Sequence, residues 1–426
     1  STIWGAWEGA LAALLLLLMP RLLFHAGLAC FDAPMVAVWF ATVAAYHAAL
    51  SSRRWAIGAG VAFGLALATK HNALLLPPAL FVHAAIIGWR DLASDLRAKQ
   101  WKRAITREPL VALAAMAVIG PLVLYALWPW LWSAPIAHAK AWIKFHLDHV
   151  HYNFEYLGEN WNHPRFPWHV AIITTLFTVP VVTLAGAALG ARVMVARWWT
   201  MRREKIEGDP TKPGLLILVS AIAAMGPFLL GSTPIFGAEK HWAPAMPSFA
   251  IAAGIGVVWA ARQLAALFDQ QHANKILAAV AVVIASAAAV ETFHAQPYAL
   301  TEYNALAGGA PGGADLGMNR QFWGYSARGV LPWLGEHKPG RVYTHDASPA
   351  WGWYIKAGLV PPLDTDSGSE FSGGIERSDY ALVIHELHFN RHDYLIWKAY
   401  GTVQPAFVLT VDGVPIVSVY SRDRSR

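Results

Sequence analysis

From residue 24 to residue 35 the chain reads Phe24-His25-Ala26-Gly27-Leu28-Ala29-Cys30-Phe31-Asp32-Ala33-Pro34-Met35, and strongly apolar segments, 9–24 and 33–50, lie on either side. Each segment is about long enough to cross a bilayer. Dehydrating a carboxylate at a membrane boundary costs free energy, so Asp32 is a candidate functional residue. The alternative carries similar weight: Asp32 caps the following helix, whose first turn suits Pro34.

The rest of the chain repeats this arrangement of apolar stretches joined by charged connections. With 56% hydrophobic and 14% charged residues, the chain is too apolar for an ordinary soluble domain. Windows free of charge predict about nine membrane-spanning helices, at 9–24, 34–51, 55–69, 73–89, 110–130, 167–191, 214–232, 243–261 and 276–290. The fold class expected is therefore a polytopic α-helical membrane protein.

Three basic connections predict the orientation of these helices. They lie at 53–54, 90–107 and 192–212, and the positive-inside rule places them in the cytoplasm. Nine spans then bring Asp32, Lys70 and His71, the loop 130–167, the loop 233–242 and everything after Glu291 to the outer face. The net charge of +6 comes mostly from the basic connections, which would face anionic head groups, so no nucleic-acid partner is expected.

The end of the chain has a different composition and predicts a second domain. We expect a membrane domain at 1–294 and a small extracytoplasmic α/β domain at 295–426. A helix is predicted at 326–337 and strands at 341–344, 380–384 and 407–411. Asp412-Gly413 is a hairpin-turn signal leading into a further strand at 415–420.

Three charged residues on the predicted outer face are together typical of a site for group transfer from a phosphate-linked donor. Transfer from a phosphate-linked donor needs cations where charge gathers on the departing phosphate, and Lys70 and Lys240 could supply them. It also needs a carboxylate that accepts a proton from the attacking hydroxyl or amine, and Asp32 could act so. The plainer interpretations are that Lys70 extends to the membrane interface and that Lys240 lies in a solvated loop.

Histidines in the long outer loop allow a metal site but do not favour one. His146 and His149 are three residues apart and would share a helix face, with Asp148 or His151 nearby. The chain lacks an HExxH pattern, so hydrogen-bonding histidines are the favoured interpretation, and no cofactor is assigned; a divalent metal is the less favoured alternative. Cys30 is the only cysteine, which excludes an intramolecular disulfide.

Several stretches, in their order and spacing, resemble one superfamily. They are 24–34, Gly64-Leu65-Ala66-Leu67-Ala68-Thr69-Lys70, Phe145-His146-Leu147-Asp148-His149, Tyr156-Leu157-Gly158, and Lys240-His241-Trp242 with Pro244 and Pro247. With these, the chain resembles bacterial relatives of the protein O-mannosyltransferases and of the lipid A aminoarabinose transferase. These belong to the C-type superfamily of polytopic membrane glycosyltransferases, and the tail is similar to the soluble domains of such bacterial proteins.

The resemblance implies an enzyme of the bacterial inner membrane that moves a sugar from a polyprenyl-phosphate donor to an acceptor on the outer side. It implies Asp32 as the catalytic acidic residue and Lys70, Lys240 and His241 as residues near the donor phosphate. The remaining substrate-loop candidates are His25, His146, Asp148, His149 and Tyr156. The acceptor, whether protein, lipid or polysaccharide, stays open.

One departure from the family pattern leaves alternatives standing. The chain is expected to begin at the family's third span, without the first outer loop that carries the family's best-known acidic residue. A transporter or flippase of lipid-linked saccharides is therefore kept as an alternative, and so is a catalytically incomplete membrane binding protein. Charges concentrated at the outer ends of the helices, rather than at the bilayer midplane, favour the enzyme.

Overall fold

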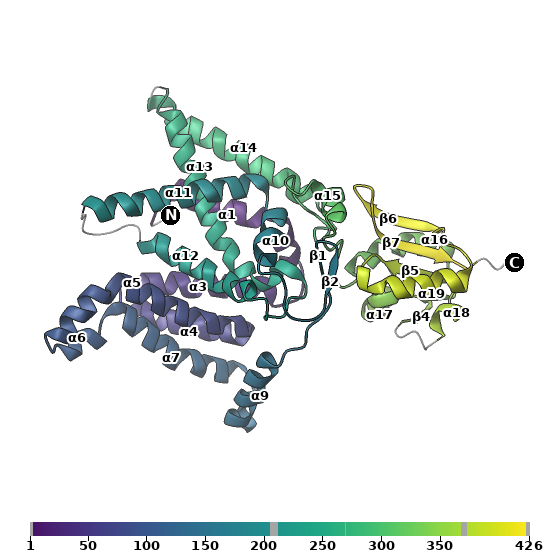
Figure 1. Ribbon diagram of the computed structural model, residues 1–426, viewed down its shortest axis with the longest axis horizontal. Coiled ribbons are helices and arrows are strands. Elements are labelled where there is room, and N and C mark those ends of the chain that lie inside the picture. Colours follow the sequence, from purple (N-terminus) through teal and green to yellow (C-terminus); the bar gives the residue numbers. More distant parts are fainter. Residues whose placement is uncertain (1–2, 205–211, 269, 368–372, 423–426) are drawn as a thin grey trace. The chain divides into compact units, whose positions relative to one another are not determined.

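The computed structural model describes residues 3–204, 212–268, 270–367 and 373–422, and these form two compact units. The helical unit comprises residues 1–151 and 164–293, and the C-terminal unit comprises residues 152–163 and 294–426 (Figure 1). The second unit thus begins next to the boundary expected at residue 295. It also includes 152–163, called the strap below, which the sequence had placed in the membrane domain.

The helical unit consists of helices joined by short turns. The α-helices are α1 (Ala6–Leu17), α2 (Pro20–Ala26), α3 (Asp32–Ala49), α4 (Arg54–Thr69), α5 (Leu76–Arg97), α6 (Trp101–Ile105), α7 (Glu108–Leu127), α8 (Trp130–Ser133), α9 (Pro135–Leu147), α10 (Val170–Thr178), α11 (Val181–Glu204), α12 (Lys212–Met225), α13 (Met246–Ala265) and α14 (Ala273–His294). The 3-10 helices that bear on the site are η1 (His71–Leu75), η2 (Gly226–Leu229), η3 (Ala238–His241) and η4 (Ala243–Ala245).

Within the described residues, five helices are long and apolar enough to cross a membrane, so this is a multi-pass helical membrane protein. They are His71–Arg97, Glu108–Leu127, Val181–Thr200, Ala243–Ala265 and Ala273–His294. The pair α1 and α2 counts as a sixth span if taken together, although it is bent by 73°.

The expected count of nine spans is therefore wrong. Helix α3, at the second expected span, is not among these helices, and prolines and short helices account for the other differences. Pro20 and Pro180 lack the N–H that continues a helix, so the first expected span breaks before α2 and the sixth breaks between α10 and α11. Two further expected spans are apolar but shorter helices, Arg54–Thr69 and Pro213–Leu229. The third basic connection, 192–212, lies partly outside the described residues.

Helix α13 is the central helix of this unit. Within its apolar window 78% of the residues are buried, against 17% in α14. Its apolar side chains pack with Leu11 and Leu15 of α1, Ala187 of α11 and Leu277 of α14. Small residues permit this approach: a Cβ at Gly190 of α11 would overlap the carbonyl of Ala252 in α13.

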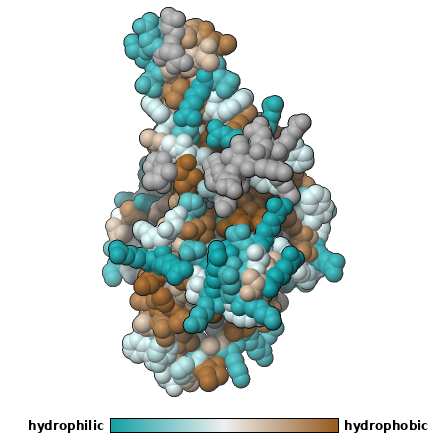
Figure 2. Space-filling view, turned by 90° about the vertical axis from the view of Figure 1, so that its left-hand side faces the viewer, coloured by the Kyte–Doolittle hydropathy of each residue, from teal (hydrophilic) through white to brown (hydrophobic). Residues whose placement is uncertain are grey.

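The helical unit has a polar end. Hydrophilic side chains gather on one face of the protein, with apolar surface between them (Figure 2). The basic side chains of the connection 90–107 are mostly exposed; Arg107 is half-buried and pairs with Asp95 at 2.5 Å. This end therefore has the composition of a surface that faces water and head groups.

The C-terminal unit contains a five-stranded mixed sheet with strand order β4-β3-β5-β7-β6. Its strands are β3 (Arg341–Tyr343), β4 (Asp364–Asp366), β5 (Tyr380–Ile384), β6 (Phe407–Val411) and β7 (Val414–Ser421), and its helices are α15 (Gly309–Asp315), α16 (Leu331–His337), α17 (Ser348–Lys356), α18 (Gly374–Arg377) and α19 (Asn390–Tyr400). Strand β3 is parallel to β4 and β5, whereas β7 is antiparallel to β5 and β6. The predicted hairpin is confirmed: Val411 pairs with Val414 across Asp412 and Gly413, both at positive φ.

Both faces of this sheet are covered, as the alternation of strand residues requires. Leu382 and Ile384 of β5 lie in a core with Leu334 of α16 and Trp351 of α17. The intervening Val383 lies on the opposite face, in a core that includes residues of α19. The strap forms its own hairpin, β1 (Phe154–Tyr156) with β2 (Glu159–Trp161), across the positive-φ residues Leu157 and Gly158.

Candidate functional site

Asp32 is the first residue of α3, and its side chain is buried. An acidic residue in the first turn suits the helix dipole, and the N-cap position of α3 is occupied by Phe31 and not by Asp32. Its Oδ1 lies 2.7 Å from Lys70 Nζ, and the two side chains are only 7% and 8% exposed. Thus the structure brings together two of the residues that the sequence singled out.

Lys70 is directed by a break in the backbone between α4 and η1. Its φ of −159° and ψ of 142° are extended, so α4 ends at Thr69 and the chain turns into η1 at His71. Lys70 also lies over the ring of Phe31, 5.4 Å from its centroid. A helix end followed by an extended residue thus aims a lysine at the start of another helix.

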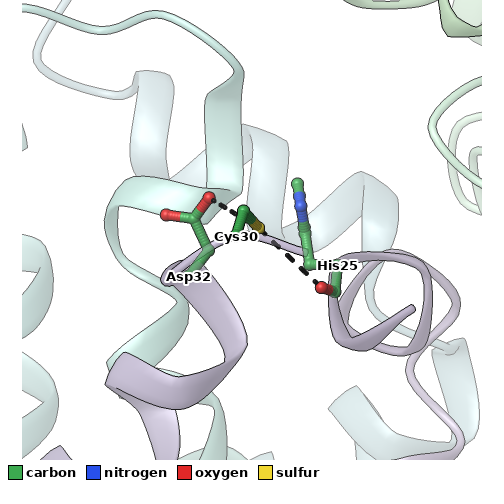
Figure 3. A group of neighbouring side chains, drawn as sticks. All are labelled: His25, Cys30 and Asp32. Atoms are coloured by element: carbon green, nitrogen blue, oxygen red, sulfur yellow. Dashed lines mark hydrogen bonds between the residues drawn. The ribbon is translucent and has the colours of Figure 1, made fainter. Parts of the chain in front are cut away.

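The loop before α3 adds a thiol and an imidazole to this corner. The Cys30 thiol lies 3.5 Å from Asp32 Oδ2 and 4.0 Å from the carbonyl of His25 (Figure 3). Burial raises the pKa of the Cys30 thiol, so it stays protonated at neutral pH. Ligand atoms of His25, Cys30 and Asp32 all lie within 4.8 Å of one another, and these three residues could hold a metal ion.

A second buried ion pair lies beside the first and was missed from the sequence. Arg21 Nη1 lies 2.9 Å from Glu239 Oε2, and His25 Nε2 lies 3.6 Å from Glu239 Oε1. Burial by itself raises the pKa of Glu239, but Arg21 and His25 lower it to about 2. Arg21 and Glu239 are 218 residues apart. The signal in the sequence was two charges inside or beside apolar spans, with nothing to pair them.

The segment around η3 connects the two pairs. Gly237 has a left-handed φ of 79°, and η3 follows it with Glu239, Lys240 and His241 in succession. Asn72 Nδ2 donates to the carbonyl of His241 at 3.0 Å, which joins η1 to η3. The His241 ring donates from Nε2 to the Phe236 carbonyl at 2.6 Å.

Burial changes the protonation of two of these groups. Burial is the main reason why the pKa of Lys240 falls to about 8; Asp32 raises it and Lys70 lowers it. Burial, reinforced by Lys70 and Lys240, holds the pKa of His241 well below its usual range. At neutral pH, Lys240 is therefore a cation and His241 a neutral imidazole.

These residues open onto a pocket of about 740 Å³ in the helical unit. Its polar lining includes Lys70, His71, Asn72, His146, His149, Lys240 and His241. Its apolar lining comes from α4, η1, α9 and the segments 127–128 and 227–236, with Leu67, Leu74, Trp128, Trp142, Phe228 and Phe236 among the residues. The pocket therefore offers a cationic and imidazole-rich region next to an extended apolar wall.

Aromatic contacts hold the histidines of this pocket. The rings of His71 and His146 stack with centroids 3.8 Å apart, and His149 stacks on Phe236 at 5.3 Å. Burial lowers the pKa of His146, so it is neutral at pH 7. Helix α9 ends at Leu147, so His146 and His149 do not share a helix face as expected, yet both line the pocket.

Other predicted residues lie elsewhere. Asp32 and His25 are buried just behind the lining, and Asp148 is exposed after the end of α9. Tyr156 belongs to β1 of the C-terminal unit, where it is 1% exposed. Tyr156 is thus part of a protein core and not of the pocket lining.

Comparison with known proteins agrees with the resemblance seen in the sequence. Residues 2–125 match the family model described as dolichyl-phosphate-mannose-protein mannosyltransferase. The resemblance is confirmed over that part of the chain, which contains Asp32 and Lys70 and ends before His146 and Lys240. No curated protein matches the chain.

Two solved structures are similar to the chain at low identity. One is the crystal structure of ArnT from Cupriavidus metallidurans bound to undecaprenyl phosphate, with 16% identity and a TM-score of 0.44 over 98% of this chain and 80% of that one. The other is ArnT from Cupriavidus metallidurans in the apo state, with 17% identity and a TM-score of 0.44 over 98% of this chain and 79% of that one.

Proposed function

We propose that the helical unit is a membrane glycosyltransferase that moves a sugar from a polyprenyl-phosphate donor to an acceptor. The observation that carries the proposal is the pocket of about 740 Å³, in which Lys70 and Lys240 lie beside an extended apolar wall. An anionic lipid phosphate needs both features, because its head group is charged and its chain is not. The family match over residues 2–125 supports the same reaction class.

In this proposal Lys70 and Lys240 bind the donor phosphate. When the bond between the sugar and the phosphate breaks, its electron pair stays on the phosphate, and two ammonium groups in a partly dehydrated pocket stabilise the added charge. The neutral ring of His146 can donate a hydrogen bond to a phosphate or sugar oxygen without adding charge. The single N–H of neutral His241 is already donated to the Phe236 carbonyl, so His241 holds the segment before η3 in place.

Asp32 is the proposed general base, and its pairing with Lys70 controls its availability. A phosphate bound to Lys70 competes with Asp32 for the ammonium protons, since both are acceptors at one donor. The carboxylate is then released to accept the proton of the acceptor hydroxyl or amine as that group attacks the sugar carbon. Donor binding thus prepares the base.

Transfer in proteoliposomes tests this function. The full chain is given polyprenyl-phosphate-linked hexoses and pentoses carrying a labelled sugar, with membrane protein, lipid and polysaccharide fractions as acceptors. The label is expected in one acceptor fraction, with polyprenyl phosphate released in equal amount. Movement of the intact donor across the bilayer without cleavage would instead identify a transporter.

The role of Asp32 is tested by Asp32→Asn in the same assay. Transfer is expected to fall at least about 100-fold, the usual contribution of a general base. The control is Asp315→Asn, because Asp315 is an exposed carboxylate of the C-terminal unit. If Asp32→Asn transfers sugar at the wild-type rate, Asp32 is not the general base. If Asp32→Asn and Asp315→Asn lose activity equally, the loss is not specific to Asp32.

We further propose that the pocket and the C-terminal unit face the outer side of a bacterial inner membrane. The basic connections at 53–54 and 90–107 support this orientation, because such segments stay in the cytoplasm. The acceptor then meets the donor outside the cytoplasm.

A further inference from the structure

The C-terminal unit contains a second polar pocket, which the proposed sugar transfer does not use. Its volume is about 240 Å³, and the strap and the segment 385–393 both line it. The lining contains the carboxylates of Glu155 and Glu386, the carboxyl group of Asp393 and one guanidinium, that of Arg320. The balance of charge favours a cation as the occupant.

Glu155, Glu386 and His388 have the separations of ligands around one metal ion. His388 Nδ1 lies 3.7 Å from Glu155 Oε1 and 3.6 Å from Glu386 Oε2, and the three ligand atoms lie within 4.8 Å of one another. These distances are longer than the donor–acceptor distance of a typical N–H···O hydrogen bond, which is about 2.7–3.2 Å. Tetrahedral bonds of about 2.0–2.2 Å to zinc place neighbouring ligands about 3.3–3.6 Å apart.

Burial makes this cluster costly without a cation. Glu155 and Glu386 are only 4% and 9% exposed. Two carboxylates that lie close together inside a protein repel each other strongly, because little water is present to screen their charges. The Nδ1 atom of His388 has no hydrogen-bond partner within the described ranges. Imidazole nitrogen and carboxylate oxygen are both ligand types that zinc takes in proteins.

Asp393 gives an independent indication at the same pocket. It is 8% exposed, it lines the pocket from the first turn of α19, and its Oδ1 makes no hydrogen bond among the residues that the structure describes. Burial raises the pKa of Asp393 to about 7. A cation in the pocket would satisfy this oxygen through a shared water or directly.

We propose that Glu155, Glu386 and His388 form a binding site for a divalent cation of the zinc class. The carboxylate of Glu155 is already oriented, because the N–H of Leu387 donates to its Oε1 and its own N–H donates to Asn319 Oδ1 at 2.7 Å. The cation joins the strap to the segment after β5. Its role is structural, and it fixes the strap within the C-terminal unit.

Zinc binding by the full chain in detergent tests the site. The protein is stripped with a chelator and titrated with Zn²⁺ against a chromophoric competitor, and metal content is measured by mass spectrometry. Glu155→Gln and His388→Gln are expected to lower the affinity of one Zn²⁺ site at least about tenfold. Glu159→Gln, an exposed carboxylate in the same strap, is expected to bind as the wild type does.

The group of His25, Cys30 and Asp32 could also take zinc, so the titrations are repeated in a Cys30→Ser background. A stoichiometry and affinity that are equal in Glu155→Gln, His388→Gln and Glu159→Gln overturn the proposal. Thermal unfolding gives a second test that does not depend on the variants folding. Zn²⁺ is expected to raise the Tm of the stripped Cys30→Ser chain, and no rise at saturating Zn²⁺ rejects the site.

Discussion

The candidate site is built from buried charges that neutralise one another in pairs. Asp32 pairs with Lys70, and Arg21 pairs with Glu239. Such pairs contribute little net stability, because dehydration offsets most of the attraction, but removing one partner leaves a buried charge. Their arrangement is thus better explained by what they hold in place, namely Lys70 and the η3 segment at the pocket.

Replacing only one partner of the Asp32–Lys70 pair should therefore destabilise the protein more than replacing both partners. Lys70→Met is expected to destabilise the protein by about 3–5 kcal/mol, because Asp32 stays buried without its cation. The double variant Asp32→Asn/Lys70→Met is expected to recover much of that loss. Thermal unfolding in detergent measures both, and a double variant no more stable than Lys70→Met contradicts the pairing.

The depressed pKa of Lys240 predicts a pH dependence for lipid-phosphate binding. An ordinary lysine keeps its proton to about pH 10.4, but Lys240 loses it near pH 8, so the cation is present below that pH and is lost above it. The Kd of undecaprenyl phosphate is expected to rise above pH 8, by up to roughly tenfold per pH unit.

Lys240→Arg is the matched variant for this measurement. A guanidinium keeps its charge throughout, so the variant is expected to show a flat Kd between pH 8 and pH 10. Lys275→Gln, an exposed lysine of α14, is expected to retain the wild-type pH profile. A wild-type Kd that does not change across pH 8 contradicts the role of Lys240.

The sequence indicated several of these residues, but not their partners. Asp32, Lys70 and Lys240 stood out because a charge next to an apolar span is unusual, and the structure brings the first two into contact. The partner of Arg21 could not be found, since the pairing depends on how distant helices pack. Tyr156 stood out in the sequence beside Leu157-Gly158, but it is buried with its neighbours in β1, which belongs to the C-terminal unit.

At the scale of elements, close helix packing around α13 supports the site. This helix follows η3 and η4 directly, so its position sets that of Lys240. Gly186 and Gly190 of α11 lie against α13, where a Cβ at Gly256 would overlap the Gly186 carbonyl. On its other side Gly254 lies against the backbone of Glu8 and Ala12 in α1.

A larger side chain at this contact should separate the helices. Gly190→Leu is expected to lower stability by at least about 1–3 kcal/mol and to weaken undecaprenyl-phosphate binding, because backbone atoms cannot move aside as a side chain can. The control is Gly88→Leu in α5, where a Cβ would meet nothing within 4 Å. Equal Tm values for the two variants contradict the tight packing of α13 on α11.

Apolar windows located the helices but miscounted the spans. Hydropathy reports that a segment is apolar, and it did so for the segments of α4, α10 and α12. It does not report helix length after a proline or a 3-10 turn, such as η2 at the end of α12. The strands β5 and β6, by contrast, match their predicted bounds, because alternation and turn residues are local properties.

At the scale of the whole molecule, the orientation of the two ends is a direct prediction. In a Cys30→Ser background, a cysteine at exposed Gln404 is expected to react with a membrane-impermeant maleimide added to intact cells. A cysteine at exposed Gln100, in the basic connection after α5, is expected to react only after the membrane is opened. The reverse labelling pattern contradicts the proposed orientation.

The strap also affects how the protein is made. The chain enters the C-terminal unit at residue 152, leaves it after residue 163 and returns only at residue 294. Glu155 and its partner Leu387 are 232 residues apart. At about 5–20 residues per second, the ribosome needs roughly 12–46 s after making the strap to make the segment that the strap contacts. Completion of the C-terminal unit must therefore wait until translation has nearly ended.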